Sequence, residues 1–190
     1  MNKINKQQAG FSYIDVMIAI TILMVGVMGL VGAITNGINM TTRSATALAA
    51  KQISSSSMEA IFTARDLDPN NNFGWDAIGN VGDAAVPGGL FLAGRQNIYP
   101  TAGRDGVIGT ADDSWGADGV SGTADDAAAS APAPGMQRQI IVTGLVDPAR
   151  PTAPITLRQI DVIIFYNAGT TERQETFTSY IANYRDSAGS

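Results

Sequence analysis

The sequence QQAGFSYIDVMIAITILMVGVMGLVGAI (residues 7–34) decides how this chain of 190 residues is organised. Asp15 stands directly before nineteen uncharged, mostly apolar residues, 16–34. A helix of this length is about what is needed to cross a bilayer core of roughly 30 Å. Because Lys3 and Lys6 precede the run, the basic flank should stay cytoplasmic and the rest of the chain should lie on the far side. The sequence therefore predicts one membrane-spanning helix over about 16–34.

An ordinary secretory signal peptide is the competing interpretation of this segment. Val31-Gly32-Ala33 could serve as its small-residue cleavage site. However, the apolar run exceeds the usual core of about 7 to 15 residues, and a carboxylate lies at its head, where such peptides are basic. We therefore expect the helix to be retained.

The carboxylate of Asp15 requires an explanation of its own. An ionised carboxylate costs about 2.5 to 3.5 kcal/mol at the centre of a membrane helix and less near the interface, so it normally has a partner or a role. The apolar segment itself contains no cation. A cut after Gly10 would create a charged amine at Phe11, four residues before Asp15, and the amine of another copy could then be the partner.

The run Gly10-Phe11-Ser12-Tyr13-Ile14-Asp15-Val16 and the apolar helix after it resemble the type IV prepilin signal. That signal is a short basic leader followed by Gly, Phe, Ser or Thr, Leu, Ile or Leu, and Glu. The resemblance implies cleavage after Gly10 by a membrane aspartyl prepilin peptidase and N-methylation of Phe11. It also implies that Asp15 pairs with the methylated amine of a neighbouring subunit. The sequence departs from the family at Asp15, one methylene shorter than the usual Glu, and at Gly32, where many major pilins have proline.

The continuation of the helix, residues 22–30, is most similar to minor pilins involved in pilus assembly and somewhat less to type II secretion pseudopilins. The resemblance implies other pilins or pseudopilins as partners through this helix, together with the prepilin peptidase and the inner-membrane assembly machinery. It implies a single pass in the bacterial inner membrane, with the lipid bilayer around the helix before assembly and the head outside the cytoplasm. The final location it implies is a cell-surface pilus.

The helix should continue well beyond the membrane. No proline occurs between the span and Pro69, and apolar residues recur at near-helical spacing. The sequence thus predicts a single helix over 11–62 and a globular head over 63–190, and the prepilin resemblance implies that residues 1–10 are a cleaved leader. The residues expected on the apolar face of the helix after the span are Ile38, Ala45, Leu48, Ala49, Ile53, Ile61 and Phe62.

A loop-rich insertion is expected over 66–134, because Gly, Pro, Asn and Asp dominate it. Its acidic balance, ten Asp against two Arg over 66–126, argues against a nucleic-acid-binding face there. Two copies of one motif, residues 103–113 and 116–126, match at nine of eleven positions. Their carboxylates could bind calcium, although the spacing does not fit an EF-hand, or could form solvated Asp-Gly turns. The candidate ligands are Asp105, Asp112, Asp113, Asp118, Asp125 and Asp126.

The last third of the chain, 137–184, has the composition of an antiparallel β-meander. Three runs rich in β-branched and aromatic residues, 139–143, 160–166 and 176–181, predict three strands, and residues 167–170 predict the hairpin turn between the last two. One face of this sheet should pack on the amphipathic part of the helix. The expected fold class is therefore α+β, pilin-like, with a long helix packed on a small antiparallel sheet. Tyr166 and Tyr180 are expected to be packing residues.

The chain contains no cysteine and no histidine, which excludes disulfides, Cys or His zinc sites and the common nucleophilic triads. Paired carboxylates could also belong to a glycosidase, but nothing marks one Asp as an acid held in an apolar pocket. We therefore expect a structural subunit of a pilus rather than an enzyme, and no cofactor apart from the calcium considered above. The alternatives are a secretion pseudopilin, a single-span protein with a calcium-binding ectodomain, and an exported carboxylate enzyme.

Overall fold

The computed structural model describes residues 10, 12–66, 73–84, 86, 88–100, 102–103, 105–114 and 132–183. Within it the chain divides into two compact units, Met1–Arg43 and Ser44–Ser190, which we call the first and second units. One helix, α1 (Tyr13–Asp66), supplies most of the described residues of the first unit and continues into the second. The prediction of one long helix is confirmed, with an end at Asp66 rather than at 62.

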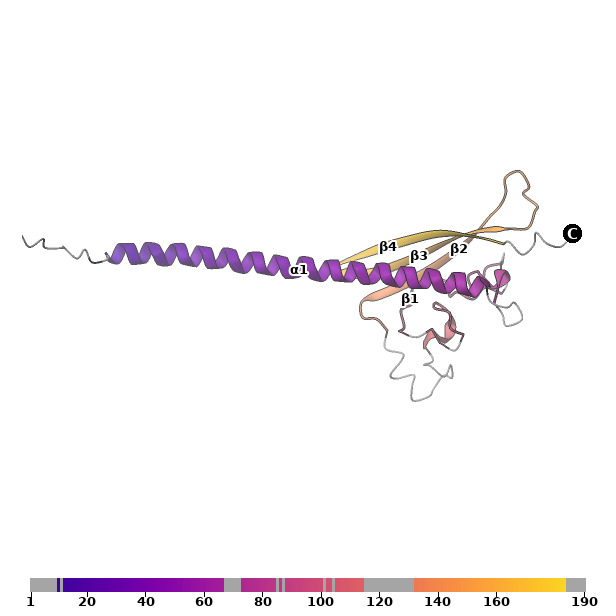
Figure 1. Cartoon of the computed structure of the whole chain (residues 1–190), viewed down its shortest axis with the longest axis horizontal. Helices are drawn as coiled ribbons and strands as arrows, with labels where there is room; N and C mark the ends of the chain where they lie inside the picture. Colours follow the sequence, from indigo (N-terminus) through magenta and orange to yellow (C-terminus); the bar gives the residue numbers. More distant parts are fainter. Residues whose placement is uncertain are drawn as a thin grey trace, which may run out of the picture. The chain divides into compact units, whose positions relative to one another are not determined.

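The second unit is an α+β fold, as predicted. Its sheet is antiparallel with the order β1-β2-β3-β4, where β2 is Met136–Leu145, β3 is Leu157–Ala168 and β4 is Thr171–Ala182. These three strands contain the three predicted runs and extend beyond them at both ends. Figure 1 shows them beside the carboxy-terminal part of α1. The β3–β4 turn consists of Gly169 and Thr170. Gly169 has a φ of 77°, a conformation that glycine adopts without strain.

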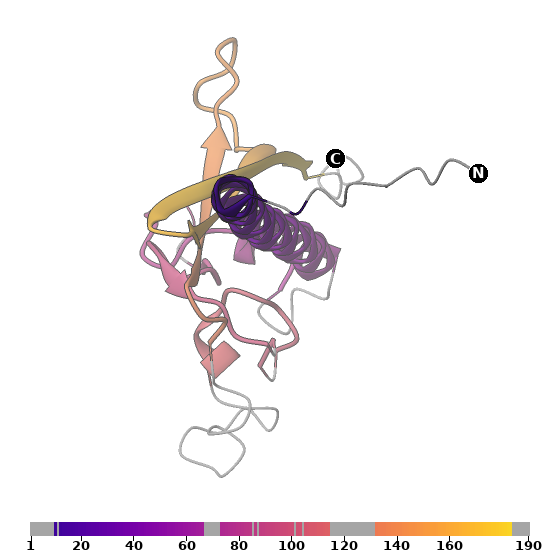
Figure 2. The ribbon, with the colours of Figure 1, turned by 90° about the vertical axis from the view of Figure 1, so that its left-hand side faces the viewer.

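The remaining strand, β1 (Gln96–Asn97), comes from the insertion and was not predicted. It has two residues, which is too short to give a periodic pattern in a segment dominated by turn residues. Its pairing with β2, Gln96 opposite Arg138 and Asn97 opposite Gln137, makes it an edge of the sheet. Figures 1 and 2 show the described part of the insertion on the β1 side of the sheet, away from β4.

The core lies between the sheet and the second half of α1. Alternate residues of β3, such as Ile160, Val162 and Ile164, are completely buried, as the period of two in a strand requires. The buried residues of α1 recur at helical spacing and are mostly small: Ala50, Ser54, Ser57, Met58, Ile61 and Ala64. Small side chains allow the backbone of a helix to come close to the layer beneath it.

The predicted apolar face of α1 is only partly correct. Ile61 is fully buried, and Ile53 and Phe62 pack at the margin of the core. Leu48, in contrast, is 59% exposed, and Ala45 is also exposed. Hydrophobic periodicity gave the larger Leu48 more weight than the Ala and Ser residues that occupy the buried face. Two tyrosines were expected to pack. Tyr166 is buried, which confirms the prediction for this residue. Tyr180 is 57% exposed on edge strand β4, so the prediction for Tyr180 was wrong.

Few of the described residues of the insertion lie in helices or strands, but the insertion contributes to the core. Its described residues form two short 3-10 helices, η2 (Trp75–Ala77) and η3 (Ala111–Ser114), and Ile78 and Phe91 are completely buried. The side chain of Asn80 joins it to the edge of β2. The Asn80 amide donates to the carbonyl oxygen of Ile140 at 2.8 Å and accepts from the amide of Val142 at 2.9 Å. This side chain therefore continues the edge pairing that β1 begins.

Candidate functional sites: the exposed half of α1 and the Asp-rich turn

The start of α1 has a specific cap, formed by Ser12 and Asp15. The amide of Ile14 donates to Ser12 Oγ at 3.3 Å, and the amide of Ser12 donates to Asp15 Oδ2 at 3.2 Å. Such a reciprocal pair is a capping box, which satisfies amide groups that the helix leaves without an internal acceptor. The negative charge also lies at the positive end of the helix dipole. Asp15 therefore has a local role that does not depend on another subunit.

Sequence reasoning missed this role, although the signal was present. Ser12-Tyr13-Ile14-Asp15 has the Ser-x-x-acid spacing that marks a capping box before an apolar run. Asp15 Oδ2 is occupied by this bond, while Oδ1 makes no hydrogen bond to any residue in the described part of the chain. Asp15 and Gly10 are both exposed. Phe11, the predicted site of N-methylation, lies outside the described residues.

The described residues of the first unit are all exposed, and almost all of them are uncharged. Leu23 and Val25, for example, are 67% and 68% exposed. The helix is long and apolar enough to cross a membrane, with a mean hydropathy of 2.5 in its most apolar stretch and no part of that stretch buried. An apolar surface of this extent is unusual on a protein that stays in water. It is consistent with a helix that anchors the chain in a membrane.

The threonine side chains of this apolar surface bond to their own helix. Thr21 Oγ1 donates to the carbonyl oxygen of Met17, and Thr35 Oγ1 to that of Val31, both at 2.9 Å. Internal bonding of this kind is needed in lipid, where no water can satisfy a hydroxyl group. These threonines are thus compatible with a membrane-spanning helix.

The glycines of this half leave open space beside the helix. A Cβ atom built on Gly26, Gly29, Gly32 or Gly37 would meet nothing within 4 Å. No contact with another described residue therefore requires glycine at these positions. Small residues on a membrane helix let a second helix approach closely. The four glycines fit a surface at which helices meet.

The Asp-rich turn is the first copy of the repeated motif, and its carboxylates make local hydrogen bonds. Asp105 Oδ1 accepts from the amide of Val107 at 2.7 Å. Asp112 accepts from the amide of Asp105 at 3.1 Å and from the hydroxyl of Thr110 at 2.7 Å. The geometry is that of side chains closing their own turn, as Asp residues commonly do.

Asp113 has a different role, because it is 3% exposed and is paired with Arg138 of β2, which is 1% exposed. Their closest atoms, Asp113 Oδ2 and Arg138 Nη2, are 3.1 Å apart. The same oxygen accepts from the amide of Gly109 at 2.7 Å, and Arg138 Nη1 donates to Ser57 Oγ on α1 at 3.3 Å. This buried network joins the insertion, the sheet and the helix. Loss of one charge would leave the other uncompensated, which typically costs about 3–5 kcal/mol.

Burial shifts the protonation equilibria of this turn. Desolvation raises the pKa of Asp113 above its ordinary value, and the hydrogen bond from Gly109 and the charge of Arg138 oppose that shift. Desolvation also raises the pKa of Asp105, where the neighbouring carboxylate of Asp112 acts in the same direction. Desolvation lowers the pKa of Arg138, opposed by Asp113. Each of these groups is therefore held in surroundings less favourable to charge than water.

The turn brings together three of the six predicted calcium ligands, Asp105, Asp112 and Asp113. In the described part of the chain, no group of three or more His, Cys, Asp or Glu side chains has an arrangement that could hold a metal ion. The ligands predicted from the second copy, Asp118, Asp125 and Asp126, lie outside the described residues. Calcium binding stays a prediction for the repeat as a whole. Arg138 was not predicted as a partner, because a single Arg in a strand carries no sign of the acid that it meets.

In comparison with known proteins, no protein-family model, no curated protein and no solved structure matches the chain. The functional argument therefore rests on the residues of the chain and their arrangement.

Proposed function

We propose that the chain is a structural subunit of a type IV pilus-like filament, processed after Gly10 and assembled through the first half of α1. The observation that carries the proposal is the exposed apolar surface of α1 directly after the run 10–16. The resemblance of that run to a prepilin signal supports it, as does a long amino-terminal helix followed by a small antiparallel sheet.

In this mechanism the chain is first anchored in the inner membrane by α1, with the second unit on the outer side. Prepilin peptidase removes residues 1–10. The apolar surface of α1 then moves from lipid to the helices of neighbouring subunits, where its glycines allow close approach. In a cell-surface filament, lipid and neighbouring helices successively cover the same surface.

Asp15 would act twice in this sequence. Its Oδ2 caps its own helix, and its Oδ1 would form an ion pair with the protonated amine of Phe11 from an adjacent subunit. A pair of this kind need not add net stability, but an unpaired charge in an apolar bundle is strongly unfavourable, so the pair would select the correct register. A minor, tip-located subunit and a secretion pseudopilin would use the same mechanism.

The proposal is tested first by the mature amino terminus. Mass spectrometry of the chain from native membranes should find a polypeptide that begins at methylated Phe11 and retains α1. Replacement of Gly10 by Phe should leave residues 1–10 attached. A native chain with Met1 in place, or one that lacks the apolar helix, would contradict the proposal.

Variants at position 15 separate the capping role of the carboxylate from its pairing role. Asp15→Asn keeps an acceptor for the amide of Ser12 but removes the charge, whereas Asp15→Ala removes both. If charge pairing drives assembly, both variants should insert into the membrane and both should enter sheared filaments poorly, by about tenfold or more. Asp15→Glu, which restores the usual family residue, should assemble well. Normal assembly of Asp15→Asn would show that only the cap matters and would refute the pairing.

A further inference from the structure

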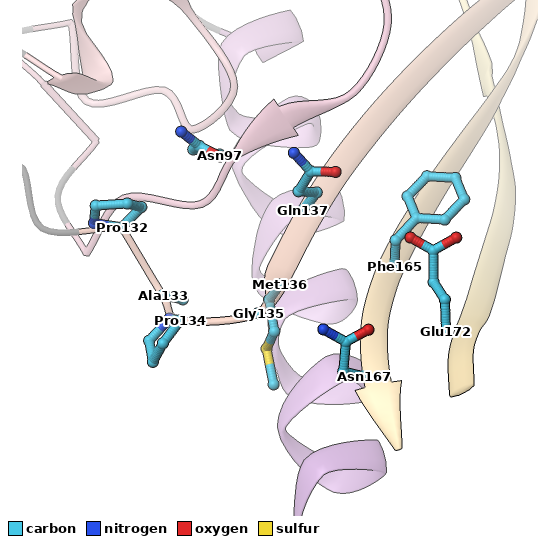
Figure 3. Close-up of a pocket in the computed structure, with 10 residues that line it drawn as sticks. All are labelled: Asn97, Pro132, Ala133, Pro134, Gly135, Met136, Gln137, Phe165, Asn167 and Glu172. Atoms are coloured by element: carbon cyan, nitrogen blue, oxygen red, sulfur yellow. The ribbon is translucent and has the colours of Figure 1, made fainter. Parts of the chain in front are cut away.

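A cavity of about 270 Å³ lies on the outer face of the sheet, near the β3–β4 turn, in the second unit. Figure 3 shows Pro132 and Pro134 on one side of it and Phe165 with Glu172 on the other. The amide side chains of three further residues lie between them: Asn97, Gln137 and Asn167. This cavity takes no part in the proposed assembly mechanism.

The strand register explains why these side chains meet. Gln137 is directly opposite both Asn97 and Phe165, and Asn167 is directly opposite Glu172. Residues that face each other across antiparallel strands lie on the same side of a sheet. Because Arg138 and the other alternate residues of β2 point into the core, this set points to the opposite face. Four strands thus bring polar groups to one end of one surface.

The three amide groups have capacity to bind a ligand. Among the described residues, none of the side chains of Asn97, Gln137 and Asn167 has a hydrogen-bond partner. Some other amide side chains of the second unit are bonded, for example those of Asn80 to β2, Gln96 to the carbonyl oxygen of Ala93, and Gln159 to Asp161. Each amide group can donate and accept at the same time.

The charges beside the cavity cancel. Arg95 Nη1 and Glu172 Oε1 are 2.9 Å apart, and the guanidinium carbon of Arg95 lies 3.6 Å from the centre of the Phe165 ring. The ion pair leaves neither an anion nor a cation in excess. An anionic ligand would approach Glu172, and a cationic ligand would approach Arg95, so a neutral ligand suits the cavity best.

We propose that this cavity binds one neutral sugar unit, a hexose or an N-acetylhexosamine. Sugar hydroxyl groups both donate and accept, as the three amides do, and the C–H face of a sugar ring can contact Pro132 and Pro134. The volume lies near the lower end of ligand pockets, about 300 Å³, and so suits a single ring. A peptide would use an extended groove or an open strand edge instead.

The test is a titration of the full chain with five sugars: glucose, galactose, mannose, N-acetylglucosamine and N-acetylgalactosamine. The chain is kept in a zwitterionic detergent, because a detergent with a sugar head group would compete for the cavity. At least one sugar should bind with a millimolar Kd and shift the side-chain amide signals of Gln137 and Asn167 in NMR spectra. Absence of binding to all five sugars would overturn the proposal. The same titration is repeated with a sialylated sugar, a sulfated sugar and an uncharged peptide. Tighter binding of any of these three would overturn the assignment to a neutral sugar.

Matched variants show whether binding occurs in this cavity. Gln137→Glu and Asn167→Asp keep the shape of the side chain but remove its donors, and each should weaken binding by at least about tenfold. Gln174→Glu makes the same change on the same face, opposite Phe165 but outside the cavity, and should leave binding unchanged. All three variants should have the same melting temperature as the wild type. Equal effects of Gln137→Glu and Gln174→Glu would refute the site.

Discussion

The two halves of α1 have the same backbone conformation but opposite surroundings. In the first half, residues 13–43, large apolar side chains are exposed throughout. In the second half, residues 44–66, six residues are buried against the sheet, and four of these are Ala or Ser. The difference shows that apolar character alone does not identify the buried face of this helix. Within the second unit, small residues let α1 pack closely on the sheet. In the first unit, the large apolar residues of α1 are exposed, as on a helix that lipid or other helices would cover.

The buried ion pair of Asp113 and Arg138 contacts the second half of α1 through Ser57, and it allows the largest effect to be predicted. Arg138→Met should destabilise the second unit by about 3–5 kcal/mol, because it leaves Asp113 as an uncompensated buried charge and removes the donor to Ser57. Chemical unfolding in detergent, followed by near-ultraviolet circular dichroism, measures this loss.

A second variant identifies charge as the cause. Adding Asp113→Asn to Arg138→Met removes the stranded charge but keeps an acceptor for the amide of Gly109. The double variant should therefore be more stable than Arg138→Met alone. If the double variant is less stable than the single one, the loss in Arg138→Met comes from packing, and the importance assigned to the ion pair is wrong.

The same truncation in each half of α1 tests the comparison directly. Ile61→Ala should lower the free energy of unfolding of the second unit by about 2–5 kcal/mol, because Ile61 is completely buried. Ile22→Ala removes the same atoms from a residue that is 67% exposed, and it should leave that free energy unchanged. The unfolding measurement described above compares both with the wild type. A comparable loss for Ile22→Ala would mean that the first half is stabilised within the single chain.

The halves also differed in how far the sequence could predict them. An uninterrupted apolar run is a strong signal, and the strands followed from their β-branched residues, so the membrane-length helix, the sheet and the α+β class were predicted correctly. The buried face of the second half was not, because Ala50, Ser54 and Ser57 give a weak hydrophobic signal. The ion pair depends on a contact between residues 25 positions apart, and local patterns do not encode it. The repeat adds a further difficulty, since both copies offer equivalent Asp residues and sequence alone cannot tell which one meets Arg138.

Glycine substitutions give the smallest predicted effect and extend the comparison to the backbone. Gly109 has a φ of 101°, and a Cβ atom there would lie 2.6 Å from Cδ1 of Ile140, so Gly109→Ala should cost about 1–3 kcal/mol. Gly29 lies in open space within α1, where alanine favours the helix by about 0.5–1 kcal/mol. Gly29→Ala should therefore leave the free energy of unfolding of the second unit unchanged but reduce incorporation into filaments, if helices meet closely at that position.

Each glycine has its own contradicting outcome. Equal incorporation of Gly29→Ala and wild type would show that the open space beside Gly29 is not used for helix contacts. An unchanged free energy of unfolding for Gly109→Ala would show that the turn can move away from Ile140.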